Sequence, residues 1–292
     1  DLPRLSRVLY WLGRIHYTAG RMDTGIEYAR RAVELAEQLA DETLQAPPVN
    51  LLGRAHFVRG EPQKACQFLA RSVRQMHAIG NRIEEATAYG MLGRSHAHLG
   101  QFPEALDAAE HGLRIAEEIE HLPTLAACLM YGGQVKCWRG DFSGLDDLER
   151  GLEIAEKSGD IFRTYVIHAT RGGWGYLLAG DSARAEQELR RALALAERLG
   201  TRFFLGGFKS YFAESRLYAG AIVEALQLSR EALQIAEESG QAWDRSVALR
   251  TLGHALLAQE PPDDQGALEA IRSAVAIQEP LGMQWELAQS LV

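Results

Sequence analysis

The sequence of 292 residues contains few cysteines and lacks long apolar runs. The three cysteines, Cys66, Cys128 and Cys137, are odd in number and have no CxxC spacing, which favours a reducing, cytoplasmic compartment over a disulfide framework. A membrane-spanning helix needs about 18 consecutive apolar residues, and no apolar run in the sequence is that long. No signal peptide is visible either. Because the chain begins at Asp1 without a methionine, we expect a fragment of a longer protein.

Strand-type runs of valine, isoleucine and threonine are also absent, whereas alanine, leucine, glutamate and arginine recur throughout the chain. This composition predicts an all-α fold. The net charge is −8, which argues against a nucleic-acid partner because binding to phosphates needs a basic footprint. We therefore expect neither a nucleic-acid nor a membrane partner.

The common catalytic motifs are missing as well. There is no glycine-rich phosphate loop ending in Gly-Lys-Ser/Thr, no HExxH and no GxSxG. His16, His56 and His96 recur at equal intervals, but stacked helices lie roughly 10 Å apart, so equivalent histidines cannot share one metal ion. Packing or a buried hydrogen bond is the better interpretation for them. The sequence predicts no enzyme, no catalytic residue, no cofactor and no metal site.

What the sequence does contain is a repeat of 40 residues, seen in two series of glycines. The first series lies inside a helical pattern, where glycine costs about 1 kcal/mol relative to alanine, so it indicates a close approach of two helices. Its members, with Ala213 filling the one gap, are Gly13, Gly53, Gly93, Gly133, Gly173 and Gly253. The second series, seven residues later, predicts left-handed caps that end each helix. Its members are Gly20, Gly60, Gly100, Gly140, Gly180 and Gly220.

A second, amphipathic helix follows each cap. In the fifth repeat its apolar residues recur at three- and four-residue spacing, from Ala185 to Ala196. Turns are expected near Gly80, Gly159, Gly200, Gly240 and Gly282. Two irregularities stand out: the fourth repeat is one residue short between Gly140 and Gly144, and the prolines of Glu260–Asp264 predict a protruding loop.

The string Tyr89-x-x-Leu92-Gly93-x-x-His96, followed by Gly100, Ala105 and Gly112, resembles the tetratricopeptide repeat, and so does Leu249-x-x-Leu252-Gly253. The resemblance implies a right-handed α-solenoid of about seven helical hairpins plus a terminal helix, as a single domain over 1–292. The expected repeats are 4–40, 44–80, 82–120, 122–159, 161–200, 202–240 and 242–280, with a partial eighth helix over 283–292. The usual period is about 34 residues. The longer period here resembles the C-terminal tails of bacterial signal-transduction ATPases and cyclase-like regulators.

In tetratricopeptide proteins the first helices of the repeats line a concave groove that binds a partner. The residue after the mid-helix glycine is Arg14, Arg54 and Arg94 in the first three repeats, and aromatic residues follow from the middle repeats onward. The candidate groove residues are Tyr10, Arg14, Tyr17, Asn50, Arg54, Phe57, Arg94, His98, Met130, Tyr131, Gln134, Trp138, Thr170, Trp174, Tyr211, Glu214 and Tyr218.

Several hypotheses follow for the function. The first is a protein- or peptide-binding scaffold or sensor of a larger cytoplasmic regulator, whose partner presents an acidic segment to the three arginines. The alternative for the arginines is pairing with acidic residues of their own stack. A second hypothesis is a sensor of a small ligand or signalling peptide, with a closed pocket near Trp138 and Trp174. A third is assembly into a homo-oligomer through an uncapped C-terminal helix that carries Trp285, Leu287 and Leu291.

Overall fold

The computed structural model describes residues 1–291 and consists of helices joined by short turns. Six helices precede the middle of the chain: α1 (Leu2–Thr18), α2 (Met22–Gln38), α3 (Glu42–Arg59), α4 (Pro62–Ala78), α5 (Arg82–His98) and α6 (Phe102–Glu118). The middle contains α7 (Leu122–Trp138), α8 (Gly144–Lys157), α9 (Ile161–Thr170), a π-helix η1 (Arg171–Tyr176) and α10 (Ser182–Leu199). The last elements are α11 (Leu205–Tyr218), α12 (Ile222–Ser239), α13 (Ala242–Ala258), α14 (Asp264–Leu281) and α15 (Gln284–Ser290). None of the described helices combines the length and the apolar character needed to cross a lipid bilayer.

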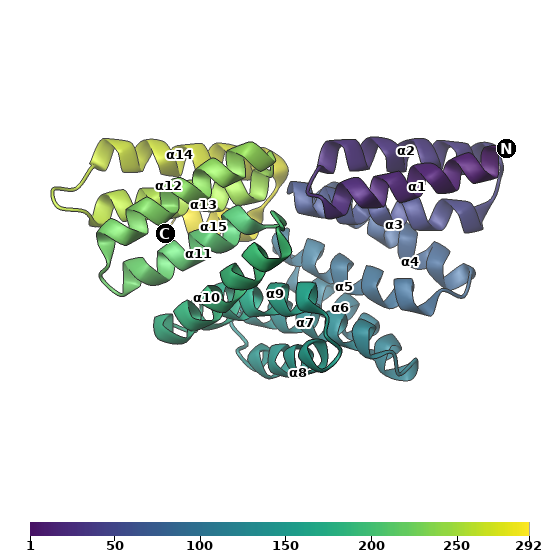
Figure 1. The fold of residues 1–292 in the computed structure, drawn as a ribbon, viewed down its shortest axis with the longest axis horizontal. Coiled ribbons are helices and arrows are strands. Elements are labelled where there is room, and N and C mark those ends of the chain that lie inside the picture. The colour runs from purple at the N-terminus through teal and green to yellow at the C-terminus, as the bar shows by residue number, and fades with distance from the viewer. Residues whose placement is uncertain (292) are drawn as a thin grey trace.

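Successive helices pair into seven antiparallel hairpins, and α15 begins an eighth, so the prediction of an all-α solenoid is confirmed. The second glycine series ends the first helix of each of the first six hairpins with a positive φ, for example +86° at Gly60 and +85° at Gly140. The five turn glycines between hairpins are left-handed too. The loop after α13 is exposed at residues 260–262, as the prolines predicted, and it projects from the array in Figure 1.

The first glycine series allows the two helices of a hairpin to touch. A Cβ on Gly93 would lie 2.6 Å from the carbonyl oxygen of Ala105, and one on Gly133 would lie 2.6 Å from that of Gly144. Both distances are far inside van der Waals contact with backbone atoms, which cannot move away cheaply. The glycine therefore sets the spacing between paired helices, as its position in the repeat predicted.

The fifth repeat departs from this pattern because the fourth repeat is one residue short. The deletion moves the inter-helix contact from Gly173 to Gly172, whose Cβ would lie 3.1 Å from the carbonyl oxygen of Ala185. A π-helix accommodates one extra residue within a helix, and η1 restores the register before Gly180. Gly173 faces the next repeat instead, where a Cβ would lie 2.5 Å from Tyr211. The expectation that Gly173 makes the close approach within its own hairpin is therefore wrong.

The hairpins form an arc that closes on itself. Figure 1 shows the N-terminal hairpins and the C-terminal hairpins approaching each other, with α5 to α10 completing the arc. Contacts between α13 and α3 and between α15 and α5 join elements that are far apart in the sequence. One hydrophobic core runs from Tyr17 to Trp285 across this closure. The concave side is therefore an enclosed interior.

Candidate ligand-binding cavity

The closure of the arc rests on α15, which lies inside the superhelix. Glu286 accepts a hydrogen bond from Nε1 of Trp243 at 2.9 Å and pairs with Nδ1 of His98 at 2.6 Å. Nε1 of Trp285 donates to the backbone oxygen of Trp138 at 3.3 Å, and the two indole rings lie 4.9 Å apart. Trp285 is buried and so adds nothing to an exposed apolar end, whereas Leu291, the other end of the same segment, is 70 % exposed.

The expectation of one continuous open groove is also wrong, because the middle of the interior is filled. Trp138 and Trp174 pack edge to face with ring centroids 5.4 Å apart, and both are buried. His98 is buried against Glu286. Gln134 and Thr170, expected on the groove surface, are both 0 % exposed. These five side chains are packed between helices and line none of the larger cavities described below.

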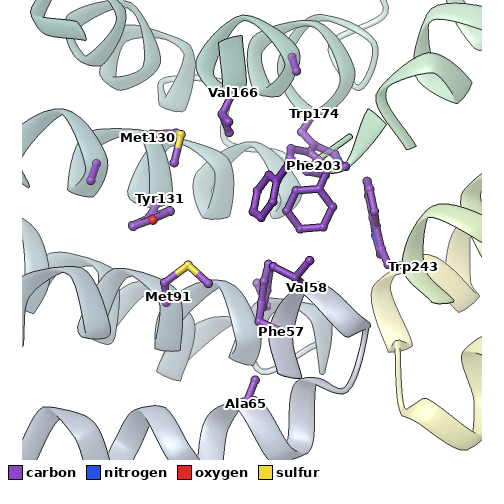
Figure 2. Close-up of a cluster of buried hydrophobic side chains, with 14 of the residues drawn as sticks. Phe57, Val58, Ala65, Met91, Met130, Tyr131, Val166, Trp174, Phe203 and Trp243 are labelled. Carbon is purple, nitrogen blue, oxygen red and sulfur yellow. The ribbon is translucent and has the colours of Figure 1, made fainter. Parts of the chain in front are cut away.

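On the N-terminal side of this filled centre lies a cavity of about 320 Å³, the interior cavity. Its walls come from α1, α3, α5, α7, α9 and the turn between α10 and α11. Figure 2 shows Phe57 and Val58 on one side and Phe203 on the other, with Met91 opposite Met130. Six predicted groove residues line it, namely Tyr17, Arg54, Phe57, Arg94, Met130 and Tyr131. The lining residues that the sequence did not predict include Met91, Phe162, Arg163, Val166, Phe203 and Phe204.

The turn between α10 and α11 closes one side of the interior cavity. Phe204 has a φ of +54°, a left-handed conformation that bulky residues rarely adopt, and this sends both phenylalanines inward. The hydroxyl of Tyr165 donates to the backbone oxygen of Phe203 at 2.7 Å and holds the turn. Phe203 meets Tyr17 of the first repeat, with ring centroids 5.9 Å apart. A signal was present in the sequence, since two adjacent phenylalanines in a turn between helices demand burial.

Three arginines and no acidic residue line the interior cavity. Arg54 lies 4.0 Å from Glu84, and Arg163 pairs with Asp160 at 3.2 Å. Arg94 is 4 % exposed, and no carboxylate of the described residues comes within 4.0 Å of it. Burial in apolar surroundings lowers the pKa of its guanidinium to about 10.

A small cavity of about 60 Å³ adjoins the interior cavity through Tyr17 and Arg54. The predicted residues Tyr10, Arg14 and Asn50 line it. Arg14 is exposed and lies over the ring of Trp11, 5.0 Å from its centroid. The amide of Asn50 donates to Glu84 at 2.8 Å. Of the three arginines that recur in the repeats, Arg54 is thus the one with an acidic partner in its own stack, and its contact with Glu84 is long at 4.0 Å.

The C-terminal half of the array has a separate cavity of about 420 Å³, which the predicted residues Tyr211, Glu214 and Tyr218 line. Its arginine, Arg250, is 3 % exposed and pairs with Glu214 at 3.0 Å. The charge in this cavity is therefore already neutralised inside the protein, in contrast to the charge of Arg94.

Two of the three repeated histidines have the packing role expected of them. The ring of His16 stacks on Tyr28 and that of His56 on Phe68, each pair with centroids 5.3 Å apart. Within residues 1–291, no group of three His, Cys, Asp or Glu side chains is arranged to hold a metal ion. Burial raises the pKa of each of the three cysteine thiols to about 12, so they are poor nucleophiles.

Comparisons with known proteins agree with this architecture. Residues 6–39 and 44–118 match models of the tetratricopeptide repeat. These segments are tetratricopeptide repeats, and the chain as a whole has the fold of a tetratricopeptide-repeat solenoid, as the resemblance of its repeats implied. No curated protein matches the sequence significantly.

Solved structures with the same fold share little sequence identity with the chain. The apo form of RapI has a TM-score of 0.64 and 16 % identity, covering 82 % of this chain and 86 % of that one. A Rap conjugation gene regulator of plasmid pLS20, in complex with the Phr* peptide, has a TM-score of 0.71 and 13 % identity, covering 94 % and 73 %. A signal-transduction ATPase from Pyrococcus horikoshii with a tetratricopeptide repeat sensor has a TM-score of 0.61 and 15 % identity, covering 98 % and 44 %. This chain thus spans less than half of that ATPase.

Proposed function

We propose that the chain is the sensor part of a larger cytoplasmic regulatory protein and that it binds a short peptide, or a small ligand like one, in the interior cavity. The observation that carries the proposal is that the walls of this cavity come from repeats that lie far apart along the arc. Tyr17 and Phe57 belong to the first two repeats, whereas Phe203 and Phe204 lie beyond the fifth. A ligand there touches the first repeats and the junction of the fifth and sixth repeats at once.

The size and location of the cavity fit this role. Ligand pockets measure about 300–1,000 Å³, and the interior cavity, at about 320 Å³, suits a small molecule or the end of a peptide. A ligand shifts a conformational equilibrium by its difference in affinity for the two states. Since an opened arc would separate Phe203 and Phe204 from Tyr17 and Phe57, binding favours closure. The peptide complexes of two Rap proteins with the same fold support the proposal.

The structure favours this hypothesis over an open scaffold. An extended partner needs a continuous trough, and the packed indoles of Trp138, Trp174 and Trp285 occupy that path. The absence of catalytic motifs, together with thiols that are poor nucleophiles because their pKa is raised, supports a binding role without catalysis.

The test is affinity selection from a pool of synthetic peptides of four to six residues, with mass spectrometry of what the protein retains after rapid gel filtration. Val166→Phe fills the interior cavity, and Val223→Phe is the matched control because Val223 is 83 % exposed on α12. We expect the wild type and the control to retain the same peptides and Val166→Phe to lose them. Equal retention by all three proteins, or none by any, would overturn the proposal.

A further inference from the structure

The chemistry of the interior cavity allows its ligand to be described more closely, on the basis of the proposed function. Arg94, Arg171 and Arg250 are the buried arginines among the described residues. Arg171 pairs with Glu149 and Glu188, and Arg250 pairs with Glu214. Arg94 alone of the three has no acidic partner, although burying an unpaired charge is costly.

The hydrogen-bonding groups of Arg94 are also unused. Its Nε is buried without a partner, and its Nη1 meets a single weak acceptor, the sulfur of Met91 at 3.9 Å. The Cζ atom lies 4.5 Å from the ring centroid of Phe57 and 5.3 Å from that of Tyr131. These cation–π contacts hold the guanidinium in place but leave its N–H groups available. Since Arg94 lines the interior cavity, these donors can serve a ligand there.

We propose that the ligand presents a free carboxylate to Arg94 and places an apolar or aromatic body against Phe57, Val166, Phe203 and Phe204. The planar fork of arginine matches a carboxylate through two parallel hydrogen bonds. A singly charged group fits because one guanidinium lacks a partner, whereas Arg54 and Arg163 each have a carboxylate nearby. The carboxylate is either the C-terminus of a peptide or that of a small organic acid.

The experiment compares free acids with their amides by isothermal titration calorimetry. The probes are the peptides retained in the pool experiment, the same peptides with amidated C-termini, N-acetylphenylalanine, its amide, and phenyl phosphate. We expect the wild type to bind free acids about tenfold more tightly than amides or better, as a charge-assisted hydrogen bond implies. Arg94→Met removes this preference and leaves amide binding unchanged, and Arg94→Lys keeps part of it because the charge remains.

The matched control is Arg190→Met. Arg190 also lies over an aromatic ring, that of Phe212 at 4.9 Å, but it is outside the interior cavity. This variant should keep the full preference for acids. Preference for acid peptides over N-acetylphenylalanine identifies a peptide C-terminus as the source of the carboxylate, and the reverse order identifies a small acid.

The outcomes separate this inference from the proposed function. If Val166→Phe abolishes binding but acids and amides bind the wild type equally, the cavity binds a ligand and the carboxylate assignment is wrong. Tighter binding of phenyl phosphate than of any carboxylate overturns the assignment as well. If none of the probes binds the wild type, the proposed function itself fails.

Discussion

Replacing Arg94 by methionine is expected to stabilise the ligand-free protein, which is unusual for a buried residue. Burial lowers the pKa of the guanidinium from 12.5 to about 10, and at about 1.4 kcal/mol per pKa unit the buried charge costs roughly 3 kcal/mol. Because the folded protein lowers the pKa of this basic group, the cost is fully present at pH 7. It is relieved as the guanidinium loses its proton above pH 10. The cation–π contacts with Phe57 and Tyr131 return about 1–2 kcal/mol. The net gain for Arg94→Met is about 1–2 kcal/mol.

The assay is urea unfolding at pH 7, followed by circular dichroism, with the midpoint compared at constant slope. Arg250→Met is the informative contrast because Arg250 is equally buried but pairs with Glu214. Removing it leaves an unpaired carboxylate, and we expect a loss of about 3–5 kcal/mol. The reasoning is refuted if Arg94→Met lowers the stability by more than about 2 kcal/mol, since Arg94 would then stabilise the fold and would not be an unpaired charge available to a ligand.

Three further predictions concern the frame of the superhelix. Asp244 is buried against the backbone N–H of Gly206, and burial raises the pKa of its carboxyl to about 7, so the unfolding free energy falls as the pH rises from about 4 to 7. Between pH 5 and pH 8 the wild type should lose roughly 2–3 kcal/mol more stability than Asp244→Asn in urea titrations. Parallel pH profiles of the two proteins would contradict this. Gly93→Ala should lower the unfolding free energy by about 2–3 kcal/mol, because its Cβ meets the backbone of Ala105. Gly140→Ala, at a left-handed cap with open space around it, should lower it by about 1 kcal/mol. A higher melting temperature for Gly93→Ala than for Gly140→Ala would refute the close-approach argument. Trp285→Ala removes the indole that bridges to Trp138 and should open the arc, which small-angle scattering would report as a larger radius of gyration, whereas an unchanged radius would show that other contacts suffice.

The local structure of the chain could be read from its sequence because it depends on neighbours along the chain. The glycines at Gly60 and Gly140 predicted helix ends, and the structure shows a left-handed residue at each. The close approach at Gly93 followed from the cost of glycine inside a helix. Even the one-residue deletion in the fourth repeat was visible. Its consequence, the π-helix at 171–176, was not, because either a bulge or a shifted hairpin could absorb it.

The candidate site was predictable in part. The period placed Arg54, Phe57 and Arg94 on one face of successive first helices, and the structure brings all three to the interior cavity. The same rule also selected Gln134 and Thr170, which are fully buried between helices. A periodic rule treats every repeat alike, whereas burial depends on which distant repeat lies opposite.

The sequence by itself determined the helical hairpins, their caps and the spacing within each pair, since these depend on residues within about 40 positions of one another. The tertiary structure alone decided that the array closes, that α15 enters its centre and that Trp138 meets Trp285 across 147 positions. Small rotations between successive hairpins add up over the whole array, and no local pattern records their sum. The buried setting of Arg94 is likewise decided by the tertiary structure, because the first five repeats and the turn before the sixth together form the cavity around it.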